Sequence, residues 1–263
     1  MKPVVLIKTG GKVAVKGPEL TNLIGEIGSL ISDYNFILVH GGGAEVTATS
    51  KIHGLEAKFI DGVRMTTNQE MEIVDGVLAG RINKRLVRNF ESLGVPAVGI
   101  SGNDGQTFIG ESIDPKVGNR TGRVIRSNPH LLETLIGAGF VPVISSVSMD
   151  DKGESLNINA DEAALSVSKS IKASKVIFIS DIPGILKDDE VLQNMTESTI
   201  NKEIKDGVIS GGMIPKVKAS LDAIKHGVKT VTISNYINKG DLKLLIDNKK
   251  GSLIREEQVW VHL

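Results

Sequence analysis

The sequence contains no cysteine. This absence excludes disulfide bonds, thiolate catalysis and cysteine-ligated zinc, and it is compatible with the cytosol. The 263 residues also carry no excess charge of one sign, because 31 lysines and arginines balance 31 aspartates and glutamates. Net charge therefore gives no reason to expect a nucleic acid or a membrane surface as a partner.

Long apolar runs and targeting segments are missing as well. No run approaches the roughly 18 apolar residues that are needed to span a bilayer. Met1-Lys2-Pro3 leads directly into a strand-like segment, without the apolar region and cleavage site of a signal peptide. We therefore expect a cytoplasmic protein with no membrane and no nucleic-acid partner.

Several well-known catalytic signatures do not occur. The sequence has no Gly-x-x-x-x-Gly-Lys-Ser/Thr loop, no Gly-x-Gly-x-x-Gly fingerprint, no His-Glu-x-x-His pair and no Gly-x-Ser-x-Gly turn. Protein-kinase signatures are absent too. If the chain binds a nucleotide, it does so with a different set of residues.

Glycine, in contrast, is abundant, and its 29 residues cluster at the ends of predicted strands. Residues 36–40 read as a short buried strand, Gly41, Gly42 and Gly43 follow, and a helix is predicted to begin at Ala44. Such a loop can bind an anion, because the backbone can approach closely and the first N–H groups of a helix are unpaired. A tight turn is an equally good explanation for one loop, but the pattern recurs at residues 8–11 and 211–213.

Strand-like and helix-like segments alternate along the chain. Strands are predicted at 4–7, 36–40, 96–100, 140–146, 175–179 and 229–233, and helices at 18–33, 44–54, 68–79, 128–138, 160–172, 197–205, from about Gly212, and at 239–246. This order predicts an α/β fold with a doubly wound, mainly parallel open sheet and helices on both faces. We expect two lobes, residues 1–173 and 174–263.

Four local features complete this expectation. Residues 61–66 are predicted to form a turn, and Thr66 or Thr67 to cap the following helix. Gly80 is predicted to interrupt that helix, with a second helix running on to Leu93. Residues 107–126 are predicted to form a β-hairpin whose arginines, at positions 120, 123 and 126, face solvent.

Two lysines follow or precede these glycines and suggest phosphoryl transfer. This reaction needs positive charge and N–H donors at the moving oxygens more than it needs covalent help. Lys8 and Lys216 could supply the charge, and the glycine loops the donors. Asp161, in the first turn of the 160–172 helix, could hold both lysines in place. Lys8 alone would be explained better as a strand-edge residue that reaches water.

Other polar residues have two interpretations each. Arg64 is either a solvated surface charge or a two-pronged ligand for a carboxylate. Asn157, Asn159 and Asp161 fall within five residues, and any one of them could simply cap a helix. Three such groups are denser than a cap requires, and the two asparagines would share a face if the segment is extended.

These motifs together resemble the amino-acid kinase family. The resemblance runs in order to about Ile254 and rests on a combination of individually weak motifs: Lys8-x-Gly10-Gly11, His40-Gly41-Gly42-Gly43, Gly62-Val63-Arg64, Asn157-x-Asn159-Ala160-Asp161, Ser180-Asp181-x-x-Gly184 and Gly211-Gly212-Met213-x-x-Lys216. It implies that the first lobe binds an acyl substrate and forms a homodimer. The second lobe would bind ATP, with Mg²⁺ held mainly through the ATP phosphates and no metal site on the protein itself.

Within the family, the chain most resembles members that phosphorylate the γ-carboxylate of N-acetyl-L-glutamate in arginine biosynthesis. Carried over by position, Gly42 and Gly43 would contact this substrate, and Arg64 and Asn157 its α-carboxylate. Lys8 and Lys216 would stabilise the moving phosphoryl group, with Asp161 organising them. The residues implied at the nucleotide are Gly10, Gly11, Ser180, Asp181, Gly184, Ile185, Leu186, Val208, Ile209, Ser210 and Gly212.

Other activities within the same fold remain open. Thr9 and Ala44 depart from the pattern on the acceptor side, which leaves a sister enzyme, such as a kinase for carrier-protein-linked aminoadipate, as the alternative. Carbamate, uridylate and isopentenyl phosphate kinases are more distant. A non-catalytic sensor is a further alternative, although the presence of both lysines and Asp161 argues against it.

The start of the sequence suggests how the activity is regulated. In the resembled family, arginine-inhibited members carry an extra helix ahead of the first strand, and only three residues precede that strand here. We therefore expect a homodimer that is insensitive to arginine. Residues 255–263 carry no interpretable pattern.

Overall fold

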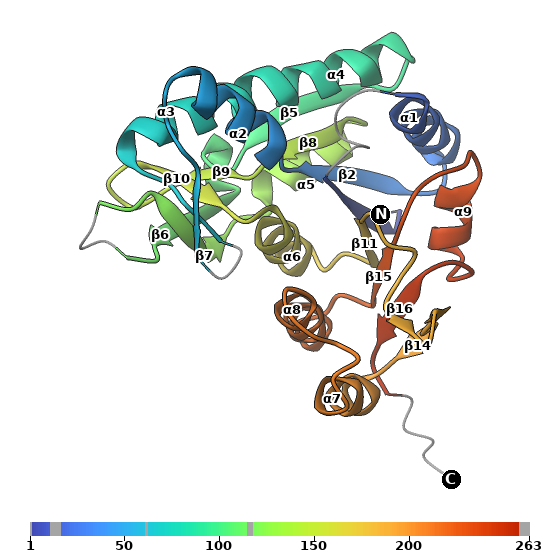
Figure 1. Cartoon of the computed structure of the whole chain (residues 1–263). Coiled ribbons are helices and arrows are strands. Elements are labelled where there is room, and N and C mark those ends of the chain that lie inside the picture. Colours follow the sequence, from blue (N-terminus) through green and yellow to red (C-terminus); the bar gives the residue numbers. More distant parts are fainter. Residues whose placement is uncertain (1, 11–16, 61–62, 115–117, 258–263) are drawn as a thin grey trace, which may run out of the picture.

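A computed structural model describes residues 2–10, 17–60, 63–114 and 118–257. In this part of the chain, the largest sheet has eight strands in the order β14-β16-β15-β11-β1-β2-β8-β5 (Figure 1). Neighbouring strands are parallel except for the pair β15 and β16, so the predicted doubly wound, mainly parallel sheet is confirmed. Its strands are β1 Val4–Thr9, β2 Asn35–His40, β5 Ala97–Ser101, β8 Val141–Ser145, β11 Lys175–Ile179, β14 Asn194–Met195, β15 Thr230–Ser234 and β16 Ser252–Arg255.

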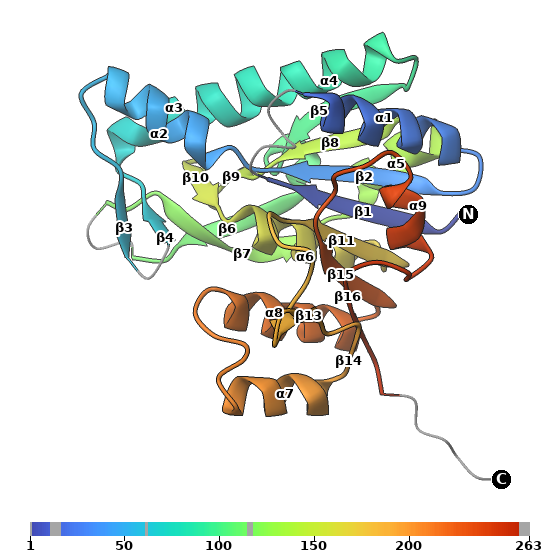
Figure 2. The same cartoon turned by 45° about the vertical axis from the view of Figure 1, so that its right-hand side comes forward.

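Helices cover both faces of this sheet, with α1 and α4 on one side and α6 and α8 on the other (Figure 2). The sheet has a hydrophobic core on each face. Successive side chains of β1 enter the two cores in turn, because neighbouring side chains of a strand point to opposite faces. Leu6 packs in the core with α5, α6 and α8, whereas Ile7 packs in the core with α1, α4 and α9. The helices are α1 Pro18–Leu30, α2 Gly43–Ile52, α3 Asn68–Asp75, α4 Asn83–Ser92, α5 His130–Gly137, α6 Ala160–Ser170, α7 Glu197–Lys205, α8 Met213–Lys225 and α9 Asp241–Ile246, with a π-helical segment η2 at Gly76–Ile82 and a 3-10 turn η3 at Asp104–Gln106.

Smaller sheets flank the main one. A four-stranded sheet has the order β6-β7-β10-β9, and its strands are β6 Phe108–Ser112, β7 Thr121–Ser127, β9 Val147–Met149 and β10 Ser155–Ile158. Strands β6 and β7 are antiparallel, which confirms the hairpin predicted for 107–126. Two short antiparallel pairs are β3 Lys58–Ile60 with β4 Val63–Met65, and β12 Leu186–Lys187 with β13 Glu190–Val191.

Two local predictions need correction. Arg64 does not lie in a turn but on β4, which pairs with β3; residues 61 and 62 are outside the described residues. The predicted interruption at Gly80 is wrong, because α3, η2 and α4 form one continuous helical stretch. A glycine inside a helix costs about 1 kcal/mol and does not forbid the helix. Here the burial of Val77, Leu78 and Ile82 holds the segment against the core.

The predicted lobe boundary falls inside the main sheet. Helix α6 ends at Ser170 and β11 begins at Lys175, and β1 pairs with β11 on one side and with β2 on the other. The sheet is therefore continuous across positions 173 and 174, and the division into two lobes stays a prediction. No helix among the described residues is both long and apolar enough to cross a membrane.

Candidate active site

The glycine loop after β2 leads directly into a helix. Gly42 is the N-cap residue of α2, which begins at Gly43. A Cβ atom on Gly42 would lie 2.2 Å from Cδ1 of Ile82 and 2.7 Å from Cδ2 of Leu78, so any larger residue would force these side chains or the loop to move. The first N–H groups of a helix have no partner inside it and can bind an anion. The loop therefore has the geometry that was expected of an anion site.

The three residues predicted to be catalytic form one cluster. Lys8 lies on β1, Asp161 is the second residue of α6, and Lys216 lies in the first turn of α8. The Lys8 Nζ lies 2.8 Å from Asp161 Oδ1, and the Lys216 Nζ lies 3.1 Å from Asp161 Oδ2. One carboxylate thus bridges two ammonium groups, and the cluster keeps an excess positive charge that can attract a phosphoryl group.

The charge state of Asp161 follows from its neighbours. Burial alone would raise the pKa of this carboxyl, but the charges and hydrogen bonds of Lys8 and Lys216 outweigh burial and hold the pKa below its ordinary value. Asp161 is therefore ionised at neutral pH and already occupied by two cations. This arrangement suits a residue that orients the lysines and does not suit a general base.

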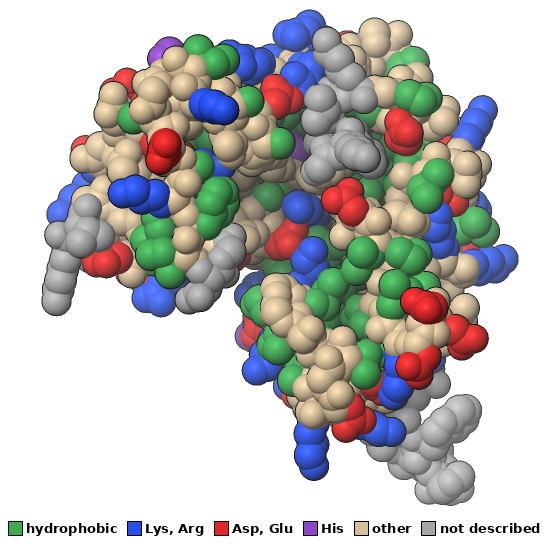
Figure 3. Space-filling view, viewed as in Figure 1, with side chains coloured by type: hydrophobic (Ala, Val, Ile, Leu, Met, Phe, Trp, Pro, Cys, Tyr) green, Lys and Arg blue, Asp and Glu red, His purple; other side chains and the backbone are tan. Residues whose placement is uncertain are grey.

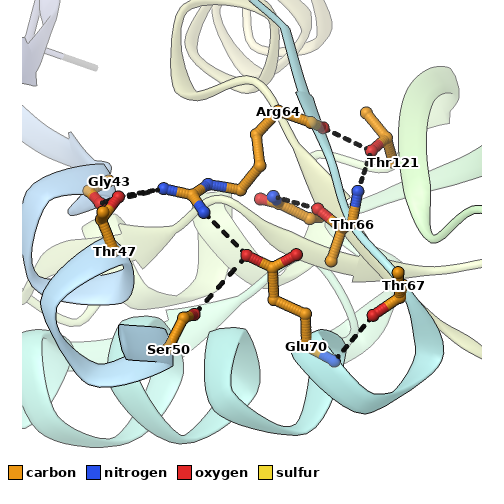
Figure 4. Close-up of polar contacts among 9 residues, drawn as sticks. Gly43, Thr47, Ser50, Arg64, Thr66, Thr67, Glu70 and Thr121 are labelled. Carbon is orange, nitrogen blue, oxygen red and sulfur yellow. Dashed lines mark hydrogen bonds and ion pairs between the residues drawn. The ribbon is translucent and has the colours of Figure 1, made fainter. Parts of the chain in front are cut away.

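Arg64 is buried inside the site and is not a solvated surface charge. Its side chain is only 8% exposed, and its guanidinium lies between the start of α2 and α3 (Figure 4). One nitrogen donates to Glu70 Oε1 at 2.7 Å, and the other donates to the carbonyl of Gly43 at 3.2 Å and to the hydroxyl of Thr47. Arg64 therefore joins the hairpin strand β4 to the glycine loop.

Two threonines connect Arg64 with Asn157. Thr121 donates its hydroxyl to the carbonyl of Arg64 at 2.5 Å and accepts the backbone N–H of Thr66 at 2.9 Å. The amide of Asn157, on β10, donates to the hydroxyl of Thr66 at 2.9 Å. Asn159 has a different role, because its Oδ1 accepts the N–H of Asp161 at 2.8 Å and caps α6. The three polar groups of residues 157–161 are thus a strand residue, a cap and a lysine bridge.

A cavity of about 520 Å³ collects most of these residues. This volume is in the range of small-molecule sites. Figure 3 shows the molecule hollowed between its upper left and lower parts, with basic and acidic side chains inside the hollow. The predicted residues that line the cavity are Lys8, Gly10, Gly42, Gly43, Arg64, Asn157 and Asp161. A second cavity, of about 460 Å³, is lined by Lys216, Gly212 and Asp161, so Asp161 borders both.

The residues predicted to contact a nucleotide are more scattered. Ser180, Asp181, Gly184, Ile185 and Leu186 follow β11, and Val208, Ile209, Ser210 and Gly212 precede α8. Ile185 and Ile209 are 3% and 1% exposed and pack in the hydrophobic core. A nucleotide could meet these two residues only through their backbone. Gly11 lies outside the described residues, and the nucleotide contacts stay predictions.

Glu70 is a residue of the site that was not predicted from the sequence. Thr67 accepts the backbone N–H of Glu70 at 3.2 Å and caps α3, as predicted for Thr66 or Thr67. The spacing Thr67-x-x-Glu70 is also that of a capping box, in which the glutamate would turn back to the cap. Instead, the carboxylate of Glu70 is buried and paired with Arg64. The capping-box spacing is present in the sequence, but it predicts that Glu70 binds the backbone N–H of Thr67 and not Arg64.

Comparisons with known proteins identify the family of the chain. The model of the amino acid kinase family matches residues 3–235. The chain belongs to the amino-acid kinase family. It is 43% identical over 197 residues to the acetylglutamate kinase of Geobacillus kaustophilus (strain HTA426), covering 75% of this chain and 76% of that relative. It is 36% identical over 266 residues to the acetylglutamate kinase of Methanocorpusculum labreanum, covering 95% and 90%.

Solved structures show the same amino-acid kinase fold. The crystal structure of smu.665 from Streptococcus mutans UA159 superposes with a TM-score of 0.81 at 25% identity, covering 97% of this chain and 99% of that one. The family resemblance inferred from scattered glycine, lysine and aspartate motifs is therefore confirmed over nearly the whole chain. In this amino-acid kinase, residues of four of these motifs line one cavity, and Gly212 and Lys216 line a second cavity that shares Asp161 with the first.

Proposed function

We propose that the protein transfers the γ-phosphoryl group of ATP to the γ-carboxylate of N-acetyl-L-glutamate, a step of arginine biosynthesis. The observation that carries the proposal is the bridge of Lys8 and Lys216 by Asp161, at the wall of a cavity that also holds the glycine loop. The identity to acetylglutamate kinases supports the choice of acceptor. The product is an acyl phosphate and ADP.

Each group of the cavity has a role in this proposal. Arg64 and Asn157 bind the α-carboxylate of the acceptor, and Gly42 and Gly43 direct backbone N–H groups at the γ-carboxylate. Lys8 and Lys216 each bind one carboxylate oxygen of Asp161. Their ammonium groups offset the negative charge that spreads over the oxygens of the moving phosphoryl group. Because both lysines are held before the reaction, little reorganisation is needed when the charge moves.

Mg²⁺ accompanies ATP in this proposal, and it neutralises part of the phosphate charge. Among the described residues, no group of three histidine, aspartate or glutamate side chains could hold a metal ion. The carboxylate of Asp161 already faces two ammonium groups. We therefore propose that the ion is held mainly by the phosphate oxygens of ATP, with the nucleotide itself lying along residues 180–186 and 208–212.

Trapping of the acyl phosphate tests the reaction. With hydroxylamine present, the protein should give a hydroxamate only when ATP, Mg²⁺ and N-acetyl-L-glutamate are all supplied. Glutamate, aspartate, aminoadipate and carbamate serve as alternative acceptors. Product from one of these acids, without product from N-acetyl-L-glutamate, would reject the acceptor but not the phosphoryl transfer.

The expected homodimer rests on the family resemblance. Light scattering should give twice the chain mass of 28.1 kDa. A mass equal to one chain would reject the dimer without bearing on the reaction.

A further inference from the structure

His40 is the last residue of β2 and stands directly before the glycine loop. Its imidazole is completely buried. Nδ1 lies 3.0 Å from the carbonyl oxygen of Gly41, and Nε2 lies 3.1 Å from Nδ2 of Asn83. A carbonyl oxygen can only accept a hydrogen bond, so Nδ1 carries the hydrogen and, in the neutral ring, Nε2 accepts one. The contacts therefore define the tautomer of His40.

Asn83 connects this histidine to the sheet. It is the first residue of α4 and is also completely buried. Its Nδ2 lies 2.9 Å from the carbonyl oxygen of Val143 and 3.3 Å from that of Ile100. Because both oxygens are acceptors, the nitrogen of the amide must face them, and the same nitrogen faces His40. Asn83 thus links His40 to the carbonyl groups of β8 and β5, with its two amide hydrogens shared among the three acceptors.

The imidazole stays uncharged at neutral pH. Burial lowers the pKa of His40 to about 4; the hydrogen bond to Gly41 raises it, and the charge of Arg85 lowers it further. Arg85 is itself paired with Glu45 of α2. The hydrogen-bonding pattern of His40 is therefore the same throughout the pH range in which a biosynthetic kinase works.

The bond to Gly41 has a consequence on the other side of the peptide. In a planar trans peptide the C=O and the N–H point in opposite directions. The carbonyl of Gly41 is held by His40, so the N–H of Gly42 is turned away from the histidine. The side chains of Leu78 and Ile82 fill the space where a Cβ of residue 42 would lie, so they pack close to the loop on that side. These residues and Asn83 belong to the same helical stretch, η2 and α4.

Resting on the phosphoryl transfer proposed above, we infer that His40 and Asn83 are positioning residues for the reaction. They fix the peptide between Gly41 and Gly42, two residues that line the same cavity as Lys8, and this would hold the N–H of Gly42 as a donor to the reacting groups. Neither His40 nor Asn83 is among the residues that line this cavity. Each acts through the glycine loop, on a donor that must be in place before the charge develops.

Paired substitutions at His40 separate positioning from packing. His40→Leu removes the donor to Gly41 and should lower kcat about 10- to 100-fold, a part of the 10²–10³ that loss of a preorganised donor costs. The KM for ATP should stay within about twofold. His40→Asn places an amide nitrogen where Nδ1 lies and should recover most of the lost rate. Equal losses in both variants would overturn the inference.

Leu86→Ala is the matched structural control. Leu86 is fully buried on α4, the helix that carries Asn83, and its side chain forms no hydrogen bonds. The substitution should lower the melting temperature while leaving kcat of the folded protein unchanged. A fall in kcat equal to that of His40→Leu would show that loosening α4 is sufficient, and would also overturn the inference.

A spectroscopic measurement decides the inference even if the His40 variants do not fold. Nitrogen-15 NMR of the wild-type imidazole should report a protonated Nδ1 and a bare Nε2 at neutral pH. The opposite tautomer would leave Gly41 without its donor and reject the inference. The kinetic comparison uses whichever acid the wild type phosphorylates, so a wrong acceptor does not affect it. If no acid is phosphorylated, the proposed function fails, while the tautomer still decides whether His40 holds Gly41.

Discussion

At the scale of single residues, the cationic side chains of the site differ in how far their charges are balanced by carboxylates. Lys8 and Lys216 share one carboxylate, and Arg64 has a carboxylate of its own in Glu70. The lysines therefore keep surplus charge for a phosphoryl group, whereas Arg64 is electrically balanced before any substrate arrives. This difference predicts different kinetic effects when each is removed.

Removal of either lysine should affect the rate more than the affinity. A donor that acts mainly in the transition state changes kcat more than KM. We expect Lys8→Ala and Lys216→Ala to lose at least about 10²–10³ in kcat with the fold retained. Lys218→Ala is the control, because Lys218 lies on the same helix and is exposed. Steady-state kinetics would contradict the assignment if kcat fell less than tenfold in both variants.

Removal of Arg64 should affect the affinity for the acid, because this side chain would bind a carboxylate that does not react. Arg64→Ala should raise the KM for the acid with a smaller change in kcat. It also leaves Glu70 buried without a partner, and breaking a buried ion pair costs about 3–5 kcal/mol of stability. Adding Glu70→Gln removes the stranded charge and should restore stability without restoring KM. Denaturant melts and kinetics on both variants separate the two effects, and an unchanged KM would make Arg64 purely structural.

His40 should make the protein sensitive to acid. Its pKa is about 4 in the folded protein and 6.5 in an unfolded chain. Between these values the unfolded chain binds a proton that the folded protein does not. The free energy of unfolding should therefore fall by about 3 kcal/mol as the pH is lowered from 6.5 to 4, with no further loss from His40 below that. Denaturant melts at several pH values should show this slope in the wild type and lose it in His40→Asn. Equal slopes would contradict the prediction.

At the scale of elements, η2 supports the glycine loop. Gly42→Ala would place a methyl group 2.2 Å from Ile82, so either the loop or η2 must move. We expect most of kcat to be lost, and Ile82→Ala in the same chain to restore part of it. Gly25→Ala on α1 is the control, because nothing lies within 4 Å of its Cβ position. It should leave kcat unchanged and stabilise the protein by up to about 1 kcal/mol. Normal kinetics for Gly42→Ala would show that the loop tolerates displacement.

The sequence predicted some elements well and others poorly, for physical reasons. Strands such as β1 and β11 are continuous apolar runs because both of their faces are buried. Strands β3 and β4 have three residues each, which is too short for alternation to be recognised, and the sequence of residues 61–66, which include β4, predicts a turn instead. The π-helical course of η2 has no sequence signature, and its glycine suggested a break.

The candidate site divides in the same way. Lysines and glycines at strand ends could be found, because the carboxyl edge of a parallel sheet brings such residues together. The partnership of Arg64 with Glu70 could not be found, because it depends on how β4 packs against α3. The roles of Asn159 as a cap and of Asn157 as a cavity residue also required the structure, since either residue could have been a cap.

At the scale of the whole molecule, the cluster of Lys8, Asp161 and Lys216 spans the predicted boundary between the two lobes. Lys8 precedes the predicted boundary at residue 173 by a long way, and Lys216 follows it, yet both bind Asp161. Asp161 itself lies before the boundary, so any relative movement of the two predicted lobes must stretch or break the Lys216–Asp161 ion pair, while the Lys8–Asp161 pair stays within the first lobe. The distance between Lys216 and Asp161 would therefore report any such movement.

The continuity of the main sheet across that boundary has a consequence for hydrogen exchange. Strand β1 forms backbone hydrogen bonds with β2 on one edge and with β11 on the other. Amides of all three strands should therefore exchange only through a shared opening, at one common free energy, because locally unfolding regions tend to be cooperative units. Mass spectrometry of peptic fragments under native conditions would measure this. If the amides of β11 and β15 opened at a lower free energy than those of β2, the main sheet would not open as one cooperative unit. The two predicted lobes of this kinase would then be separate units of folding.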